Sequence, residues 1–274
     1  MGRLLGYMAN RADRLRDALY QERAAITQAP GTTPDGWGMG FYQGGEVLHK
    51  KRPQLSGEAA NWEDIAGDVR SHCVIAHLRQ ATVGDFRAEN THPFRMRQWI
   101  FAHNGTVDRF AALRERLLEA MPDFVRRNVR GDTDSEHIFA AILSFLHDEG
   151  HIDNSEVDDK PVLQAIRNAV ALIDRLSGEV GAKPGGLNFV LTNGRKMFAL
   201  RRGAPMAYVE RQGLHDPENQ RTSNISLRET AEAAALRYVL IVSDGPTPPA
   251  GYATMEDQSI LVVDRDLRVT KYVL

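Results

Sequence analysis

The spacing of apolar residues changes twice along the chain, and this order limits the folds that the chain can adopt. Residues 4–8 form a short apolar run typical of a buried strand, and strand-like runs return from residue 187 onward. Between residues 113 and 176, apolar residues recur at three- and four-residue steps, as in amphipathic helices. The order of strands, helices and strands lacks regular βαβ alternation. It therefore predicts an α+β or layered arrangement and argues against a doubly wound parallel sheet.

The same patterns predict the individual elements. In the first half we expect strands over residues 4–8, 73–77 and 98–102, a hairpin of 37–42 with 46–49, and helices over 12–26 and 58–70. In the second half we expect helices over residues 113–129, 135–147 and 162–176, followed by strands over 187–192, 196–200, 207–210, 236–242, 260–263 and 268–273. Residues 212–230 are expected to form a long loop with a short helix, so that residues 1–274 make one domain.

Composition narrows the classes of partner. The net charge of −2 gives no electrostatic footprint for nucleic acid or an anionic membrane, and the basic run at residues 49–52 is best explained as a solvated strand end. Cys73 is the only cysteine, so no intrachain disulfide can form, and its apolar neighbours predict a core position. Without a membrane-length apolar run or a signal peptide, a cytoplasmic protein is expected.

Four short segments carry residues that suit chemistry on an amide. They are MGRLLGY at residues 1–7, AHLRQATVG at 76–84, FAHNGT at 101–106 and GDTDSE at 131–136. Asn104 and Gly105 offer a side-chain amide and a main-chain N–H, the kind of donors that stabilise an oxyanion. Asn-Gly is also the commonest tight hairpin turn, which is our reading of Asn193-Gly194 between two expected strands.

In order and content, these segments resemble the class II glutamine amidotransferases, most closely the small single-domain branch related to YafJ. That resemblance implies an N-terminal-nucleophile hydrolase fold, a four-layer αββα sandwich. In the family a cysteine follows the initiator methionine, and the chain's own α-amine, with an ordinary pKa of about 8, acts as base. This sequence has Gly2 at that position, which offers no thiol. Gln80 and Val83 also depart from residues found in several amidotransferases.

The resemblance assigns roles to further residues, each with a simpler alternative. Arg79, helped by Thr82, would hold the α-carboxylate of glutamine, although a strand-end arginine is often only a surface residue. Asp134 would face the α-ammonium, although the surrounding sequence is also an ordinary helix start. His92 would line the substrate pocket, or serve a structural role in its loop. The segment DGWG at residues 35–38 matches a glycine-rich part of the family, where small residues let the backbone approach the site.

Histidine spacing gives no support for a metal centre. None of the histidines at positions 72, 77, 92 and 103 lies in an H-E-x-x-H or C-x-x-C arrangement, so structural roles are favoured and no cofactor is expected.

Two functions therefore remain open. The first is a glutaminase-like amidohydrolase that cleaves the side-chain amide of glutamine or a γ-glutamyl amide to glutamate and ammonia or an amine. In that case Gly2 makes this form inactive or nearly so, and any ammonia acceptor would be a separate partner. The second is a non-catalytic γ-glutamyl-ligand-binding protein or regulatory subunit.

Overall fold

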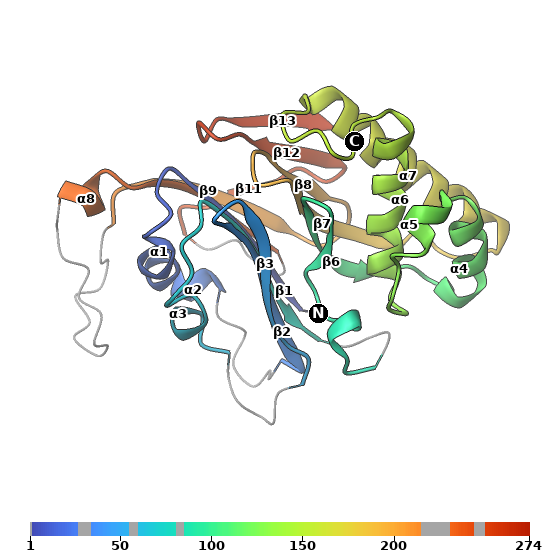
Figure 1. Ribbon diagram of the computed structural model, residues 1–274, viewed down its shortest axis with the longest axis horizontal. Coiled ribbons are helices and arrows are strands. Elements are labelled where there is room, and N and C mark those ends of the chain that lie inside the picture. Colours follow the sequence, from blue (N-terminus) through green and yellow to red (C-terminus); the bar gives the residue numbers. More distant parts are fainter. Residues whose placement is uncertain (1, 27–33, 55–59, 81–84, 215–230, 244–249) are drawn as a thin grey trace.

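Two antiparallel sheets form the centre of the protein. The computed structural model describes residues 2–26, 34–54, 60–80, 85–214, 231–243 and 250–274 (Figure 1). The first sheet has the order β11-β9-β10-β1-β4-β2-β3, and the second has the order β13-β12-β8-β7-β6-β5. Strand β1 therefore lies at the centre of the first sheet, while β3 and β5 are edge strands.

The strands divide between the sheets as follows. The first sheet contains β1 Arg3–Ala9, β2 Gly36–Gln43, β3 Glu46–Arg52, β4 Cys73–Arg79, β9 Met206–Gln212, β10 Arg237–Ser243 and β11 Ala253–Thr254. The second contains β5 Phe94–Met96, β6 Trp99–Thr106, β7 Gly186–Thr192, β8 Met197–Arg201, β12 Ser259–Val263 and β13 Val269–Val273.

Helices cover the outer face of each sheet (Figure 1). On the first sheet these are α1 Leu15–Gln21, α2 Arg23–Ile26, α3 Trp62–Ile65 and α8 Ala231–Ala234. On the second they are α4 Phe110–Glu119, α5 Asp123–Arg126, α6 Asp134–Asp148 and α7 Asp159–Glu179. The layers follow one another as helix, sheet, sheet and helix, which confirms the expected αββα sandwich.

Alternation along the central strand explains this layering. Successive side chains of a strand point to opposite faces of its sheet. Leu5 and Tyr7 pack with the helices of the first sheet, whereas Leu4 and Met8 pack between the two sheets. All four are at most 1% exposed. A strand that is apolar on both faces is what two covered sheets require, and the run at residues 4–8 has that composition.

Most expected elements are present, with some changed bounds. The hairpin pairs Gln43 with Glu46, and strands lie where the sequence predicts them for β1, β4, β7, β8, β9, β10, β12 and β13. The short strands β5 and β11 were not predicted. The expected helix over 12–26 is divided at Glu22, and the one over 113–129 is divided near Pro122. Pro122 cannot donate a main-chain hydrogen bond, which accounts for the second break. Helix α3 is shorter than expected, while residues 55–59 and 215–230 lie outside the described part.

Candidate functional site

The topology of the sheets brings the four sequence segments together. Gly2 directly precedes β1, and β1 pairs with β4 so that Arg3 is opposite Leu78. Arg79 is the last residue of β4, which places it next to the start of β1. Asn104 lies near the end of β6 in the facing sheet, and Asp134 is the first residue of α6.

Asn104 links the two sheets at this end of the sandwich. Alternation along β6 turns His103 toward α6, where its Nδ1 lies 2.9 Å from Ser135 Oγ, and turns Asn104 toward the first sheet. The Asn104 side-chain amide donates to the Gly2 carbonyl oxygen at 2.7 Å and to Ser243 Oγ at 3.1 Å. Ser243 is itself 1% exposed and accepts a hydrogen bond from the Leu4 main-chain N–H at 3.2 Å.

Gly105 belongs to the strand and not to a hairpin turn. It pairs with Leu187 on β7, and a Cβ added to it would lie 2.0 Å from the Gly186 carbonyl oxygen. A glycine is therefore required by close backbone approach, and the turn interpretation of this Asn-Gly pair is wrong. At the second Asn-Gly pair the turn is present, because Gly194 has a φ of +83°.

Arg79 is not an exposed strand-end arginine. Its side chain is buried, with the residue only 4% exposed, and Nη1 donates to the Asp85 carbonyl oxygen at 3.1 Å. The guanidinium carbon also lies 5.5 Å from the centre of the Phe86 ring. Burial lowers the pKa of Arg79 from its usual value, against the attraction of Asp35 and Asp85.

Asp134 lies at the start of a helix, as the surrounding sequence predicts. The preceding residue, Thr133, is the N-cap of α6, and its side chain accepts from the Glu136 main-chain N–H. The Asp134 carboxylate accepts from the Val107 N–H at 2.7 Å and from the Ser135 N–H at 2.8 Å. These bonds hold a buried, 3% exposed carboxylate in one orientation at the helix start.

A narrow cavity of about 40 Å³ joins these groups, and we call it the Gly2 pocket. It is lined by Gly2, His77, Arg79, Gln80, Asn90, His92, His103, Asn104, Gly105, Thr133, Asp134 and Ser135. Every candidate site residue in the described part of the chain is included. Thr82 lies outside the described residues.

Three histidines of the Gly2 pocket, His77, His92 and His103, are buried, and their burial favours the uncharged imidazole. The rings of His77 and His92 lie 4.3 Å apart, and His77 Nδ1 and both ring nitrogens of His92 have no hydrogen-bond partner among the described residues. Burial, together with His103 and Arg79, lowers the pKa of His77 to about 3. Burial also lowers the pKa of His92 well below its usual value, and lowers that of His103 against the attraction of Asp134.

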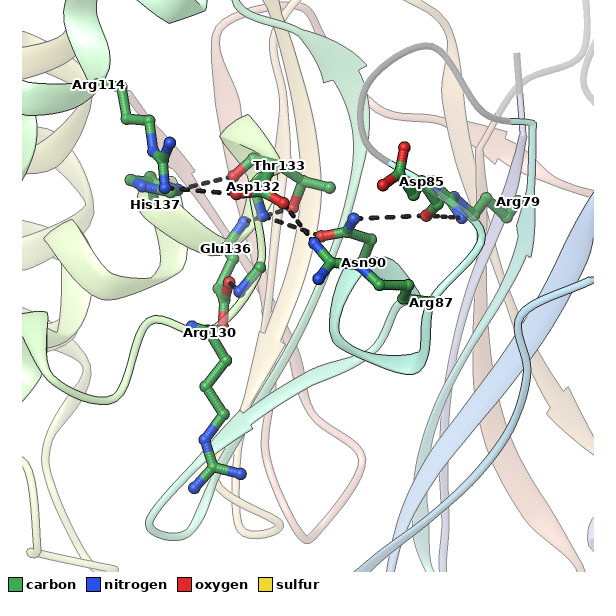
Figure 2. A network of polar contacts seen from close by, with 11 residues as sticks. Arg79, Asp85, Arg87, Asn90, Arg114, Arg130, Asp132, Thr133, Glu136 and His137 are labelled. Carbon is green, nitrogen blue, oxygen red and sulfur yellow. Dashed lines mark hydrogen bonds and ion pairs between the residues drawn. The ribbon is translucent and has the colours of Figure 1, made fainter.

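Some residues of the site were missed by sequence reasoning. Ser243 lies at the end of β10, far from every motif, and no local pattern marks it. His77 precedes Arg79 by two residues, so strand alternation predicts that both point the same way. Asn90 accepts from the Asp132 N–H at 2.9 Å and joins a polar network with Arg87 and Asp132 beside the pocket (Figure 2).

The other sequence candidates have structural explanations. Cys73 is 1% exposed, and burial raises the pKa of its thiol to about 12, which confirms a core position and leaves no reactive thiolate. Gly38 does allow close backbone approach, since an added Cβ would lie 2.0 Å from the His92 carbonyl oxygen. Within the described residues, no group of three or more His, Cys, Asp or Glu side chains is arranged to hold a metal ion. None of the helices in the described residues is long and apolar enough to cross a membrane.

Comparison with known proteins finds relatives that are described as glutamine amidotransferases or as a γ-glutamyl hydrolase. A Haemophilus influenzae protein is 29% identical over 66% of this chain, and Escherichia coli YafJ is 33% identical over 53%; both are described as "putative glutamine amidotransferase". The match spans 55% of the length of each relative. The γ-glutamyl-hercynylcysteine sulfoxide hydrolase of Mycobacterium tuberculosis is 40% identical over 27% of this chain and 33% of its own length.

Solved structures and a family model extend the likeness over the whole chain. A glutamine aminotransferase class-II domain protein from Silicibacter pomeroyi has a TM-score of 0.64 at 20% identity, covering 99% of this chain and 98% of its own. The glutamine phosphoribosylpyrophosphate amidotransferase of B. subtilis has a TM-score of 0.58 at 16% identity, covering 99% of this chain and 49% of its own. At these identities the structures establish a shared fold. The model of the class II glutamine amidotransferases matches residues 1–270, and the chain belongs to that family.

Proposed function

We propose that the Gly2 pocket binds the γ-glutamyl group of glutamine or of a γ-glutamyl amide, and that residues 1–274 act as one glutaminase-like domain. The observation that carries the proposal is the 2.7 Å hydrogen bond from the Asn104 amide to the Gly2 carbonyl. It joins the residue at the family's nucleophile position to Asn104, one of the two proposed oxyanion donors, and the other, Gly105, lines the same pocket. The same pocket contains Arg79 and Asp134.

The two charged groups suit the two ends of an amino acid. Arg79 would pair with the α-carboxylate, because a planar guanidinium can donate two parallel hydrogen bonds to it. Asp134 would face the α-ammonium. Its carboxylate has about four acceptor positions, and the hydrogen bonds from Val107 and Ser135 leave capacity for another donor. His92 and Thr82 would complete the walls of the substrate site.

With a cysteine at position 2, the reaction would be amide hydrolysis through a thioester. Once the initiator methionine is removed, the α-amine of residue 2 takes the thiol proton, and sulfur attacks the side-chain carbonyl carbon. Asn104, exchanging one of its two existing side-chain contacts, and Gly105 donate to the oxyanion. The α-ammonium of residue 2 gives its proton to the leaving ammonia or amine, and water then hydrolyses the thioester to release glutamate. A separate partner would accept any ammonia that is transferred. The form with Gly2 has no sulfur atom for the first bond, so we expect it to lack this activity.

The relatives support a wider substrate range than glutamine alone. One of them is named as a hydrolase of a γ-glutamyl compound, γ-glutamyl-hercynylcysteine sulfoxide. Recognition in our proposal uses only the α-carboxylate, the α-ammonium and the γ-carbonyl, which all γ-glutamyl amides share. A panel of such amides would therefore identify the leaving amine.

Gly2→Cys is the direct test of the enzyme. We expect the variant to release glutamate from glutamine and to lose this activity on thiol alkylation. Gly178→Cys is the matched control, because it adds a thiol at an exposed glycine of α7 far from the pocket residues in sequence. If the Gly2→Cys protein, with its methionine removed as judged by mass spectrometry, is no more active than the control, the enzyme proposal fails.

One observation favours the second function, a non-catalytic γ-glutamyl-ligand-binding or regulatory protein. A Cβ added to Gly2 would lie 2.2 Å from the Leu78 carbonyl oxygen, so a side chain at this position requires the backbone to shift. A glycine at the second codon of the natural gene would support the binding protein, whereas a cysteine codon would support the enzyme. Calorimetry with glutamine on the Gly2 form should detect binding that Arg79→Met removes and the surface variant Arg70→Met retains. Absence of any binding would contradict both functions.

A further inference from the structure

A second cavity, much larger than the Gly2 pocket, opens where the edge strands of the two sheets approach each other. Its volume is about 650 Å³, and we call it the Lys51 cavity. Strand β3 contributes Lys51, β5 contributes Phe94 and Arg95, and the segment between α5 and α6 contributes Arg130. The volume falls in the range of about 300–1,000 Å³ typical of small-molecule sites.

Positive charge predominates around this cavity. Lys51, Arg95, Arg97 and Arg130 give four cations, whereas Glu89 and Glu136 give two anions, a local excess of two positive charges. The protein as a whole carries a net charge of −2, so the cavity is opposite in sign to the chain that contains it. A concave surface with one sign of charge concentrates ligands of the other sign.

Lys51 is the inner cation of the cavity, and its hydrogen bond is to the main chain. Its Nζ donates to the Ala88 carbonyl oxygen at 3.2 Å and lies 5.6 Å from the centre of the Phe94 ring. In the described part of the chain, no carboxylate oxygen lies within 4.0 Å of this nitrogen. Burial lowers the pKa of Lys51 to about 8, and the more distant Glu136 and Glu89 offset this only in part. Around neutral pH the group remains mainly charged.

Glu136, one of the two carboxylates that line the cavity, already accepts hydrogen bonds from the backbone. Glu136 accepts from the main-chain N–H groups of Arg130 at 3.1 Å and Gly131 at 2.6 Å. Figure 2 shows Glu136 beside the main chain of Arg130, while the Arg130 side chain extends away from it. The other two arginines, Arg95 and Arg97, are exposed and place positive charge at the rim of the cavity. Arg97 Nε lies 3.7 Å from an Asp153 carboxylate oxygen, and Arg95 donates to the Val47 carbonyl oxygen.

We propose that the Lys51 cavity is a binding site for a small polyanion that carries phosphate or several carboxylates. Lys51 would bind the anionic group at the inner wall, the arginines would make bidentate hydrogen bonds at the rim, and the Phe94 ring would support an apolar part of the ligand. This site is separate from the proposed glutamyl pocket. The two cavities share a wall, because Glu89 and Glu136 line one while the adjacent residues Asn90 and Ser135 line the other.

The test is calorimetric titration of the full chain at low ionic strength with two probes, inorganic pyrophosphate and citrate. We expect saturable binding of at least one probe that weakens as sodium chloride is added. Lys51→Met and Arg130→Gln should each weaken it by about tenfold or more, because each removes a charge-assisted contact. Binding of pyrophosphate alone would identify a phosphate ligand, and binding of citrate alone a polycarboxylate.

Lys50→Met is the matched control. Lys50 is the neighbouring residue of β3 but contacts the Ile65 carbonyl oxygen at 3.1 Å, on the opposite face of the strand. The Lys50→Met protein should bind both probes as tightly as the unsubstituted protein does. Thermal melts should verify that all three variants are folded. The proposal is overturned if neither probe binds, or if Lys51→Met and Arg130→Gln bind like Lys50→Met. Because no glutamine is present, these results do not depend on the proposed function of the Gly2 pocket.

Discussion

The side-chain amide of Asn104 donates a 2.7 Å hydrogen bond to the main-chain carbonyl of Gly2, 102 residues earlier in the chain. The second proton of the same amide is directed at Ser243 Oγ, 3.1 Å away. The proposed oxyanion donor is thus fixed by the start of one strand and the end of another. Its orientation depends on both contacts.

We expect Ser243→Ala to destabilise the protein by about 1–3 kcal/mol, because it removes the acceptor of the Leu4 N–H and of one of the two protons of the buried Asn104 amide. Urea denaturation followed by circular dichroism would measure the change. Ser259→Ala is the control, since its hydroxyl donates only to a neighbouring carbonyl in an exposed contact, and we expect it to change stability by no more than about 0.5 kcal/mol. Equal effects of the two substitutions would mean that Ser243 does not hold the site.

Two glycine substitutions should have opposite effects. Gly2→Ala should lower the unfolding free energy by about 1–3 kcal/mol, because its Cβ would lie 2.2 Å from the Leu78 carbonyl oxygen. Gly178→Ala should raise it by about 0.5–1 kcal/mol, because Gly178 lies in α7 and an added Cβ there has no atom within 4 Å. Thermal or urea unfolding would compare them. A Gly2→Ala variant as stable as the parent would indicate that residue 2 moves without cost.

The buried histidines make stability depend on pH in a defined direction. The pKa of His77 is about 3 in the folded protein, compared with an ordinary value of 6.5. The unfolded chain therefore binds more protons between these values, and stability is lost as pH falls from about 6.5 toward 3. One such histidine contributes at most about 1.4 kcal/mol per pH unit.

Denaturation series between pH 4 and 8 would measure this slope. His77→Gln should reduce it relative to the parent, while Ser259→Ala, which alters no titratable group, should leave it unchanged. The comparison removes the contribution of carboxylates, which titrate in all three proteins. An unchanged slope in His77→Gln would contradict the assignment of a neutral buried histidine.

A buried carboxylate on the far face of the first sheet should also contribute to stability. Burial works to raise the pKa of Glu22, but hydrogen bonds from Arg211, Tyr252 and Tyr238 together hold it below its usual value. The Tyr252 hydroxyl donates to one Glu22 carboxylate oxygen at 2.7 Å, and the Tyr238 hydroxyl donates to the other at 2.8 Å. We expect Glu22→Gln to cost about 1–3 kcal/mol at neutral pH, with the difference from the parent shrinking as pH falls and the parent's carboxylate is protonated. Urea denaturation would measure the change, with Glu210→Gln at an exposed position of β9 as the control.

Local patterns predicted much of the fold. The apolar run at residues 4–8, the glycine pair in the hairpin at residues 44–45 and the three-to-four-residue spacing of α7 each determine their element through nearby residues alone. The break of the first helix was not predictable in this way. Glu22 ends α1, and its side chain meets Arg211, which is 189 residues away in the sequence.

The candidate site was predictable where its residues form motifs. Gly2, Arg79, Asn104 and Asp134 line one pocket, as the resemblance implied, because they lie at the ends of neighbouring strands and at a helix start. Ser243 was not predictable, since its contact with Asn104 depends on the pairing of β10 with β1. The role of Gly105 was ambiguous in the sequence, because the backbone that approaches it closely belongs to Gly186, 81 residues later in the chain.

The central position of β1 has a practical consequence for work on this protein. Gly2 lines the pocket and leads directly into a strand held on both sides by β10 and β4, so any residues fused ahead of it would emerge beside Arg79. The other end of the chain follows β13, an edge strand of the second sheet, well away from the N-terminus (Figure 1). Affinity tags and fluorescent labels therefore belong after Leu274, where they leave the mouth of the pocket unobstructed.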